Sequence, residues 1–155
     1  MLVERFLLVA LMAIPTSYAC SCSEPTVQEA KQRATVIFRG SITALRQATT
    51  TVRIMPEDTG KIAVFHVTRV WKGAVGKTFE MRALEEGSAC WGFSPQLLKV
   101  GAELIVYAFR AGEEYYTSVC TRTRFVRYAT KDVAELGLGT EPKPIDMLLQ
   151  EPKSK

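Results

Sequence analysis

Four cysteines, Cys20, Cys22, Cys90 and Cys120, are the residues of this sequence with the clearest capacity for chemistry. Grouped thiols can form disulfides, bind a zinc ion or act as a redox pair. The last two uses are disfavoured, because the sequence lacks the C-x-x-C spacing that is typical both of zinc ligands and of redox pairs. In an exported chain, an even number of cysteines is typical of disulfides.

The first nineteen residues predict that the chain is exported. Arg5 supplies a positive charge, residues 6–14 are an unbroken apolar run, and Ser17 and Ala19 place small side chains at the two positions that a signal peptidase recognises. The run is shorter than the roughly 20 apolar residues that span a bilayer, so we expect no membrane insertion. A serine stands where a lipoprotein signal has an aliphatic residue, which disfavours lipidation. We predict a signal peptide at residues 1–19, a mature chain beginning at Cys20, and secretion to the extracellular space or a periplasm.

All plausible disulfides involve the first residues of that mature chain. A bridge between Cys20 and Cys22 would close a very tight, strained ring. We therefore expect each of them to pair with Cys90 or Cys120, and both pairings stay open. Such bridges close loops of about 70 and 100 residues and could each contribute about 4 kcal/mol by restricting the unfolded chain. Because chain termini normally fray, two crosslinks here indicate either a terminus that must hold one shape or one that only closes an end of the fold.

The elements that would position these cysteines are mostly short strands. Apolar and β-branched residues predict strands at residues 36–42, 61–71, 78–83, 104–109 and 115–119. Gly40 predicts a bulge or bend in the first of them. Helical spacing at residues 25–34 predicts a short helix, and a second helix, capped by Thr130, would end at Gly137.

Five strands with a helix near each end predict a mainly β protein of one domain. We expect residues 20–137 to form an OB-fold-like, closed, five-stranded barrel with short flanking helices and two disulfides. A β-sandwich built from the same strands is the alternative, because periodicity does not distinguish the two. The proline-rich residues 138–155 are expected to be a loosely ordered tail.

Composition and the remaining polar residues argue against several functions. A net charge of +4 over 155 residues is too small and too scattered to indicate nucleic-acid binding. His66, the single histidine, lies within an apolar strand, and the sequence has no Ser-His-Asp set, paired-acid motif or phosphate-binding glycine loop. We therefore expect neither an enzyme nor an intrinsic cofactor, and we expect a monomer.

Several segments of residues 20–125 together resemble the inhibitory, netrin-like domain of the tissue inhibitors of metalloproteinases. The C-x-C at a signal cleavage site, with two further cysteines at nearly matching distances, is the most specific part of the likeness. The matching segments are Cys20-Ser21-Cys22-Ser23, Ala30, Ala34, Val36-Ile37-Phe38-Arg39, Phe65-His66-Val67, Trp71-Lys72-Gly73, Ser88-Ala89-Cys90, residues 101–109 and Thr117-Ser118-Val119-Cys120. Gln32 stands where the family has a cysteine of a third bridge.

The resemblance implies an OB-fold barrel with the bridges Cys20–Cys90 and Cys22–Cys120. It also implies that the partner is a zinc metalloprotease. In that family the α-amine and carbonyl of the first cysteine bind the catalytic zinc of the target, so Cys20 would contact a metal that the partner supplies. Ser21 would then enter the specificity pocket beside the zinc. The rest of the inhibitory edge would be formed by Cys22, Ser23, Glu24, Ser88, Ala89 and Cys90.

The sequence is also compatible with two other functions. A netrin-like module without inhibitory activity could bind an extracellular protein or a polyanion, with contacts from Arg122, Arg124 and Arg127; these arginines are otherwise expected to form a solvated strand face. A thiol oxidoreductase that uses Cys20 and Cys22 is the enzyme alternative.

Overall fold

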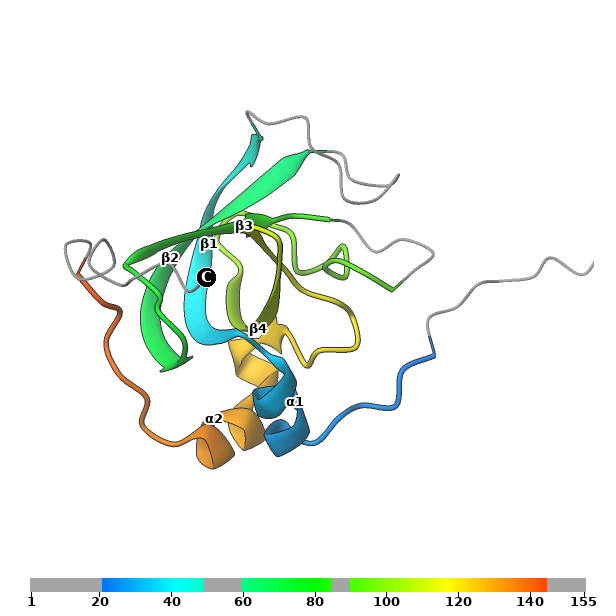
Figure 1. The fold of residues 1–155 in the computed structure, drawn as a ribbon, viewed down its shortest axis with the longest axis vertical. Helices are drawn as coiled ribbons and strands as arrows, with labels where there is room; N and C mark the ends of the chain where they lie inside the picture. The colour runs from blue at the N-terminus through cyan, green and yellow to red at the C-terminus, as the bar shows by residue number, and fades with distance from the viewer. Residues whose placement is uncertain (1–20, 49–59, 85–89, 145–155) are drawn as a thin grey trace, which may run out of the picture.

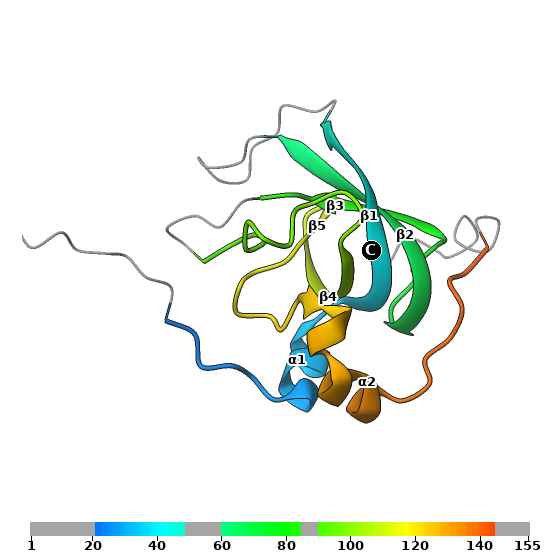
Figure 2. The same cartoon turned by 180° about the vertical axis from the view of Figure 1, so that it is seen from behind.

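Five strands form a nearly closed antiparallel barrel in the computed structural model, which describes residues 21–48, 60–84 and 90–144 (Figures 1 and 2). The strands are β1 (Val36–Gln47), β2 (Lys61–Lys72), β3 (Thr78–Arg82), β4 (Glu103–Ala111) and β5 (Glu114–Tyr116). They hydrogen-bond in the order β3-β2-β1-β4-β5, and β3 lies beside β5. A short strand, β6 (Arg124–Phe125), also pairs with β4. This is the predicted OB-like barrel rather than a β-sandwich.

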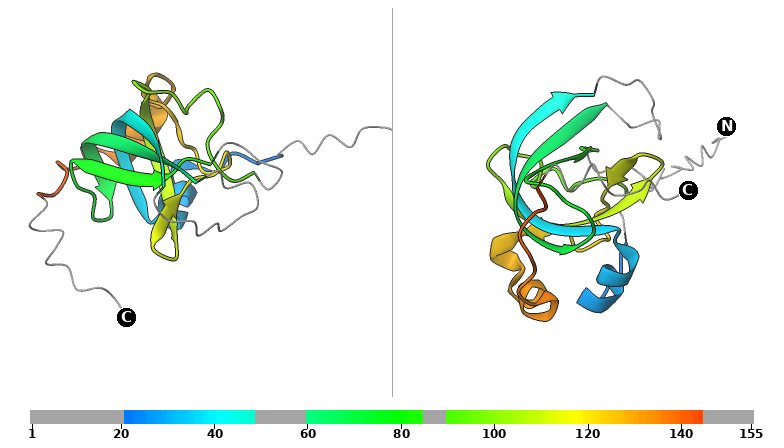
Figure 3. Two further views of the ribbon diagram at one scale, coloured as in Figure 1. Left: turned by 90° about the horizontal axis from the view of Figure 1, so that it is seen from above. Right: turned by 60° about the vertical axis from the view of Figure 1, so that its left-hand side comes forward.

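Two short helices lie together at one end of the barrel (Figure 3). Helix α1 (Val27–Arg33) starts two residues later than predicted, because Thr26 and Glu29 form a capping box. Helix α2 (Thr130–Leu136) ends at Gly137 as predicted. Thr130, however, is its first residue and not its cap: Ala129 holds the cap position, with no side-chain bond to the helix. A 3₁₀ turn, η1 (Val126–Tyr128), precedes α2.

Buried side chains form two cores, one inside the barrel and one between the barrel and the helices. Alternation along β1 explains the division, since Phe38 points into the barrel and Ile37 toward the helices. Strand β4 contributes to both cores, and its residues 104–108 are all buried. The inner core holds the aromatic rings of Phe38, Phe65, Phe79 and Phe93.

Gly40 lies at a bulge in β1, as the sequence predicts. The pairing of β1 with β2 shifts register between Arg39 and Gly40. A Cβ atom on Gly40 would approach the carbonyl oxygen of His66 to 2.8 Å, so a side chain here would force the two strands apart. His66 itself is exposed on β2.

The structure corrects one other sequence prediction, the end of the fifth strand, and shows two contacts that the sequence analysis does not include. The strand expected at residues 115–119 ends at Tyr116, and the chain then turns. Arg82 lies opposite the buried face of β3 but is 1 % exposed, and it forms an ion pair with Glu114. The start of the predicted loose tail is attached to the barrel, because Thr140 and Val70 exchange two backbone hydrogen bonds of 2.7 and 2.8 Å. Residues 145–155 lie outside the described residues.

Among the described residues, no helix is both long and apolar enough to cross a membrane. The predicted signal peptide at residues 1–19 lies outside the described residues.

Candidate functional site

The segment from Ser21 to Pro25 carries most of the predicted inhibitory edge that the structure describes. It has no regular secondary structure and leads into α1 (Figure 1). Ser21, Ser23 and Glu24 are exposed, whereas Cys22 is half-buried and Pro25 is buried. The chain therefore offers Ser21, Ser23 and Glu24 to solvent and is attached to the barrel at Cys22 and Pro25. Cys20, Ser88 and Ala89 lie outside the described residues.

A disulfide between Cys22 and Cys120 ties this segment to the turn that follows β5. The two Cα atoms are 5.4 Å apart, across a sequence separation of 98 residues. Of the two pairings that the sequence leaves open, this is the one that the family resemblance implies.

Cys90 lies beside that disulfide. Its sulfur atom is within 4.8 Å of the sulfur atoms of Cys22 and Cys120, and it is itself disulfide-bonded. The predicted partner, Cys20, lies outside the described residues, so the Cys20–Cys90 bridge stays a prediction. With that bridge, two crosslinks would converge on the start of the predicted mature chain.

Backbone contacts hold Cys90 against the segment that contains Cys120. The carbonyl of Cys90 accepts hydrogen bonds from the Ser118 hydroxyl at 2.8 Å and from the Val119 amide at 3.2 Å. The Ser118 hydroxyl in turn accepts a bond from the Cys120 amide at 3.1 Å. These bonds align the two cysteines side by side, and Cys90 adopts a left-handed backbone with φ 60°.

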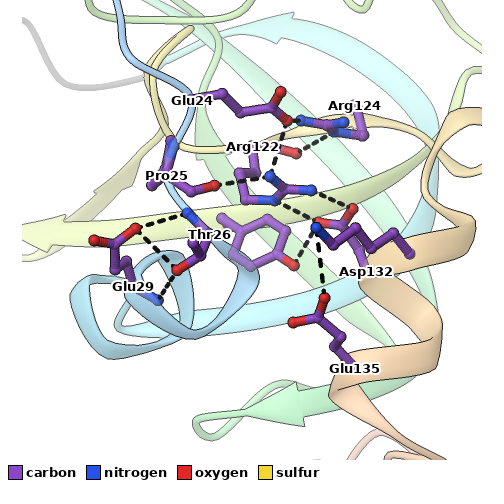
Figure 4. A network of polar contacts seen from close by, with 10 residues as sticks. Glu24, Pro25, Thr26, Glu29, Arg122, Arg124, Asp132 and Glu135 are labelled. Atoms are coloured by element: carbon purple, nitrogen blue, oxygen red, sulfur yellow. Dashed lines mark hydrogen bonds and ion pairs between the residues drawn. The ribbon is translucent and has the colours of Figure 1, made fainter.

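The guanidinium of Arg122 forms a second attachment of the N-terminal segment (Figure 4). Its Nη1 donates to the carbonyl of Pro25 at 2.8 Å and lies 2.9 Å from Oε1 of Glu24. Its other side binds Asp132 of α2 in a bidentate manner, with Nε–Oδ1 and Nη2–Oδ2 distances of 2.9 and 2.8 Å. Arg122 thus joins residues 24–25 to α2.

This polar network lies in the interior. Arg122 is 8 % exposed and Asp132 is fully buried. The hydroxyl of Tyr107 donates a further bond to Oδ1 of Asp132 at 2.7 Å. Arg124, which is half-buried, forms an ion pair with Oε1 of Glu24, the same oxygen that lies beside Nη1 of Arg122.

The network lowers the pKa values of its two carboxylates and raises the pKa of its tyrosine. Burial raises the pKa of Asp132, but hydrogen bonds from Arg122 and Tyr107 outweigh burial and place this pKa below its ordinary value. The hydrogen bond from Arg124 lowers the pKa of Glu24. Burial, followed by the bond to Asp132, raises the pKa of Tyr107. Both carboxylates are therefore ionised at neutral pH and both arginines have a counter-charge.

These contacts correct the expectation that Arg122, Arg124 and Arg127 form one solvated face. Only Arg127 of the three is exposed, and its guanidinium lies 4.3 Å from the ring centroid of Phe125 and 4.9 Å from that of Tyr128. No local pattern in the sequence indicates the Arg122 network. Pro25 lies 97 residues from Arg122, and Asp132 reaches it only once α2 has docked on β4.

A comparison of the chain with protein-family models finds no matching family, and a comparison with curated proteins finds no match either.

Proposed function

We propose that the protein is a secreted inhibitor of zinc metalloendopeptidases that acts in the manner of the tissue inhibitors of metalloproteinases. Cys20, freed by signal cleavage, binds the catalytic zinc of the target through its α-amine and its carbonyl. Ser21 enters the adjacent specificity pocket, and Ser23, Glu24, Ser88 and Ala89 extend the contact. The observation that carries the proposal is the exposed segment from Ser21 to Glu24, held by a disulfide at Cys22 and by Arg122 at residues 24–25.

Zinc chemistry explains why a chain terminus suits this task. A catalytic zinc keeps one coordination position for water or substrate, and a bidentate backbone group can occupy it and displace the water. The amine must lose its proton to bind, which costs little at neutral pH because a free α-amine has a pKa of about 7.7–8.

Rigid attachment explains why such a terminus could bind tightly. An edge that already has its bound shape loses little conformational entropy on association, so more of the contact energy appears as affinity. The Cys22–Cys120 bridge and the Arg122 contacts restrain the segment on both sides of Ser23. A freely moving terminus would have to be ordered at the moment of binding, at about 1–2 kcal/mol per residue.

The alternative proposal, a netrin-like module that binds a polyanion without inhibition, has less support. Two of the three arginines that would supply its contacts, Arg122 and Arg124, are engaged by Asp132 and Glu24. Of these three arginines, Arg127 is the exposed one.

An inhibition assay against a panel of zinc endopeptidases tests the proposal. The secreted chain that begins at Cys20 is expected to inhibit at least one of them, and a small hydroxamate that occupies the same zinc is expected to compete with it. Serine and cysteine proteases serve as controls and should be unaffected. Failure to inhibit any zinc enzyme, or inhibition that the hydroxamate does not weaken, would contradict zinc binding by Cys20.

A further inference from the structure

Zinc binding by a chain terminus makes no use of the buried charges behind that terminus. Arg122 and Asp132 form an ion pair whose side chains are 7 % and 1 % exposed. Removing such charges from water is costly, and apolar residues of the same size often stabilise a fold equally well. A domain with two apolar cores does not need this pair for stability alone, so the geometry of the pair requires another explanation.

The geometry links α2 to the segment that leaves the barrel toward Cys20. Asp132 and Tyr107 fix one side of the Arg122 guanidinium, and the opposite nitrogen, Nη1, meets the Pro25 carbonyl and the Glu24 carboxylate. A planar group held at one edge by a bidentate bond presents its remaining donors in a fixed direction. Apolar side chains would fill the same volume but would not set the direction of the chain at residues 24–25.

Two unusual backbone conformations also lie beside the N-terminal segment. Among the described residues, only two residues other than glycine have a left-handed backbone, Cys90 with φ 60° and Arg122 with φ 73°. A bulky residue adopts this region at a cost in free energy, and such conformations persist where the surroundings over-determine them. Both residues lie against the N-terminal segment, one beside the Cys22–Cys120 sulfur atoms and the other beneath Glu24 and Pro25.

We infer that Arg122 is a positioning residue, which, anchored by Asp132, sets the direction in which residues 21–24 leave the barrel. It acts through Glu24 and Pro25. Its consequence for inhibition rests on the proposed function, but the positioning itself can be measured without a protease.

Backbone order parameters from ¹⁵N relaxation test the inference on the secreted, folded chain. In the unaltered protein, Ser23 and Glu24 are expected to be nearly as rigid as the strands, with S² of about 0.8. In Arg122→Met their S² should fall below about 0.6 while β1 and β4 stay rigid. Unchanged order at Ser23 and Glu24 in this variant would overturn the inference.

Two further variants serve as a control for Arg122→Met and as its replacement if it does not fold. Arg39→Met removes a different arginine–carboxylate pair, with Glu103, whose side chains are 41 % and 43 % exposed; it should leave residues 23 and 24 rigid. If Arg122→Met does not fold, Glu24→Gln removes the exposed end of the network at a side chain that is 57 % exposed. The same criterion then applies to it: a loss of order at residues 23 and 24 supports the inference, and unchanged order contradicts it.

Inhibition gives a second and separate readout. If the unaltered chain inhibits a zinc endopeptidase, Arg122→Met should raise its inhibition constant about 10- to 100-fold, because the segment must then be ordered on binding. Arg39→Met should leave the constant unchanged. If the unaltered chain inhibits nothing, the proposed function fails, and the order parameters alone decide whether Arg122 positions the segment.

Discussion

Tyr107 donates its hydroxyl hydrogen to Oδ1 of Asp132 at 2.7 Å, in the core between β4 and α2. The same carboxylate oxygen accepts a bond from Nε of Arg122 at 2.9 Å. Tyr107 therefore links β4, which contributes side chains to both cores, to the Arg122–Asp132 ion pair.

Removing that hydroxyl should destabilise the fold measurably. In Tyr107→Phe the buried carboxylate of Asp132 loses one donor, which typically costs about 1–3 kcal/mol. The free energy of unfolding from urea denaturation measures the loss. Tyr115→Phe is a matched control, because the Tyr115 ring packs on Phe79 and its hydroxyl has no hydrogen bond among the described residues. Equal stability of the two variants would contradict the role of the Tyr107 hydroxyl.

Acid should weaken the fold through Asp132. Its pKa in the folded protein lies below the ordinary value of 3.8, so folding favours the ionised form. The resulting stability is fully present above that ordinary value and is lost as the pH falls through the lower, folded-state pKa. Asp132→Asn should therefore reduce the dependence of the urea midpoint on pH between about pH 6 and pH 2. Some dependence should remain, since the pKa values of Glu24, Glu29 and Glu114 are lowered too.

An identical acid dependence in Asp132→Asn and in the unaltered chain would contradict this account. Asp132→Asn should also be less stable than the unaltered chain at neutral pH, because Arg122 would remain buried without a full counter-charge.

The disulfide at Cys22 should contribute a large share of the stability. Replacing both Cys22 and Cys120 by serine opens a loop whose ends are 98 residues apart in the sequence. The expected loss is about 3–5 kcal/mol, which urea denaturation measures. Ser23→Ala, at the exposed neighbouring position, should change the stability by less than about 0.5 kcal/mol. A loss below about 1 kcal/mol in the double variant would contradict a crosslink that restrains the unfolded chain.

Inhibition should weaken as the solution becomes acidic. Protons compete with zinc for the α-amine of Cys20, whose ordinary pKa is about 7.7–8, so the inhibition constant should rise steadily below about pH 6. The assay needs a target enzyme that remains active over this range, with the hydroxamate as a control for changes in the enzyme itself. A constant that is unchanged relative to the hydroxamate would contradict binding through a free amine.

Strand prediction succeeded where one face of a strand is buried. Phe79, Met81 and Ala83 alternate in the sequence and are all buried, and Gly40 lies at the predicted bulge. It failed after Tyr116, where side chains replace strand pairing: the Thr117 hydroxyl donates to the Tyr107 carbonyl at 3.0 Å and the chain turns. The alternation of apolar and polar residues in a sequence does not indicate hydrogen bonds of this kind.

The candidate site divides in the same way. The family resemblance implied the Cys22–Cys120 pairing, which residue spacing alone left open. The attachment by Arg122 was missed, because it joins residues 25, 122 and 132 only when the barrel, α1 and α2 are assembled. Buried ion pairs between distant segments follow from tertiary packing and leave no periodic signal in a sequence.

The most direct test of zinc binding by Cys20 is the inhibition constant of a chain that carries one additional alanine before this residue. The extension moves the free amine away from the Cys20 carbonyl, so the two can no longer bind one zinc ion together. We expect inhibition to be lost, while the midpoint of urea denaturation and the circular dichroism spectrum of the protein stay unchanged. Inhibition by the extended chain that equals that of the chain beginning at Cys20 would contradict the account.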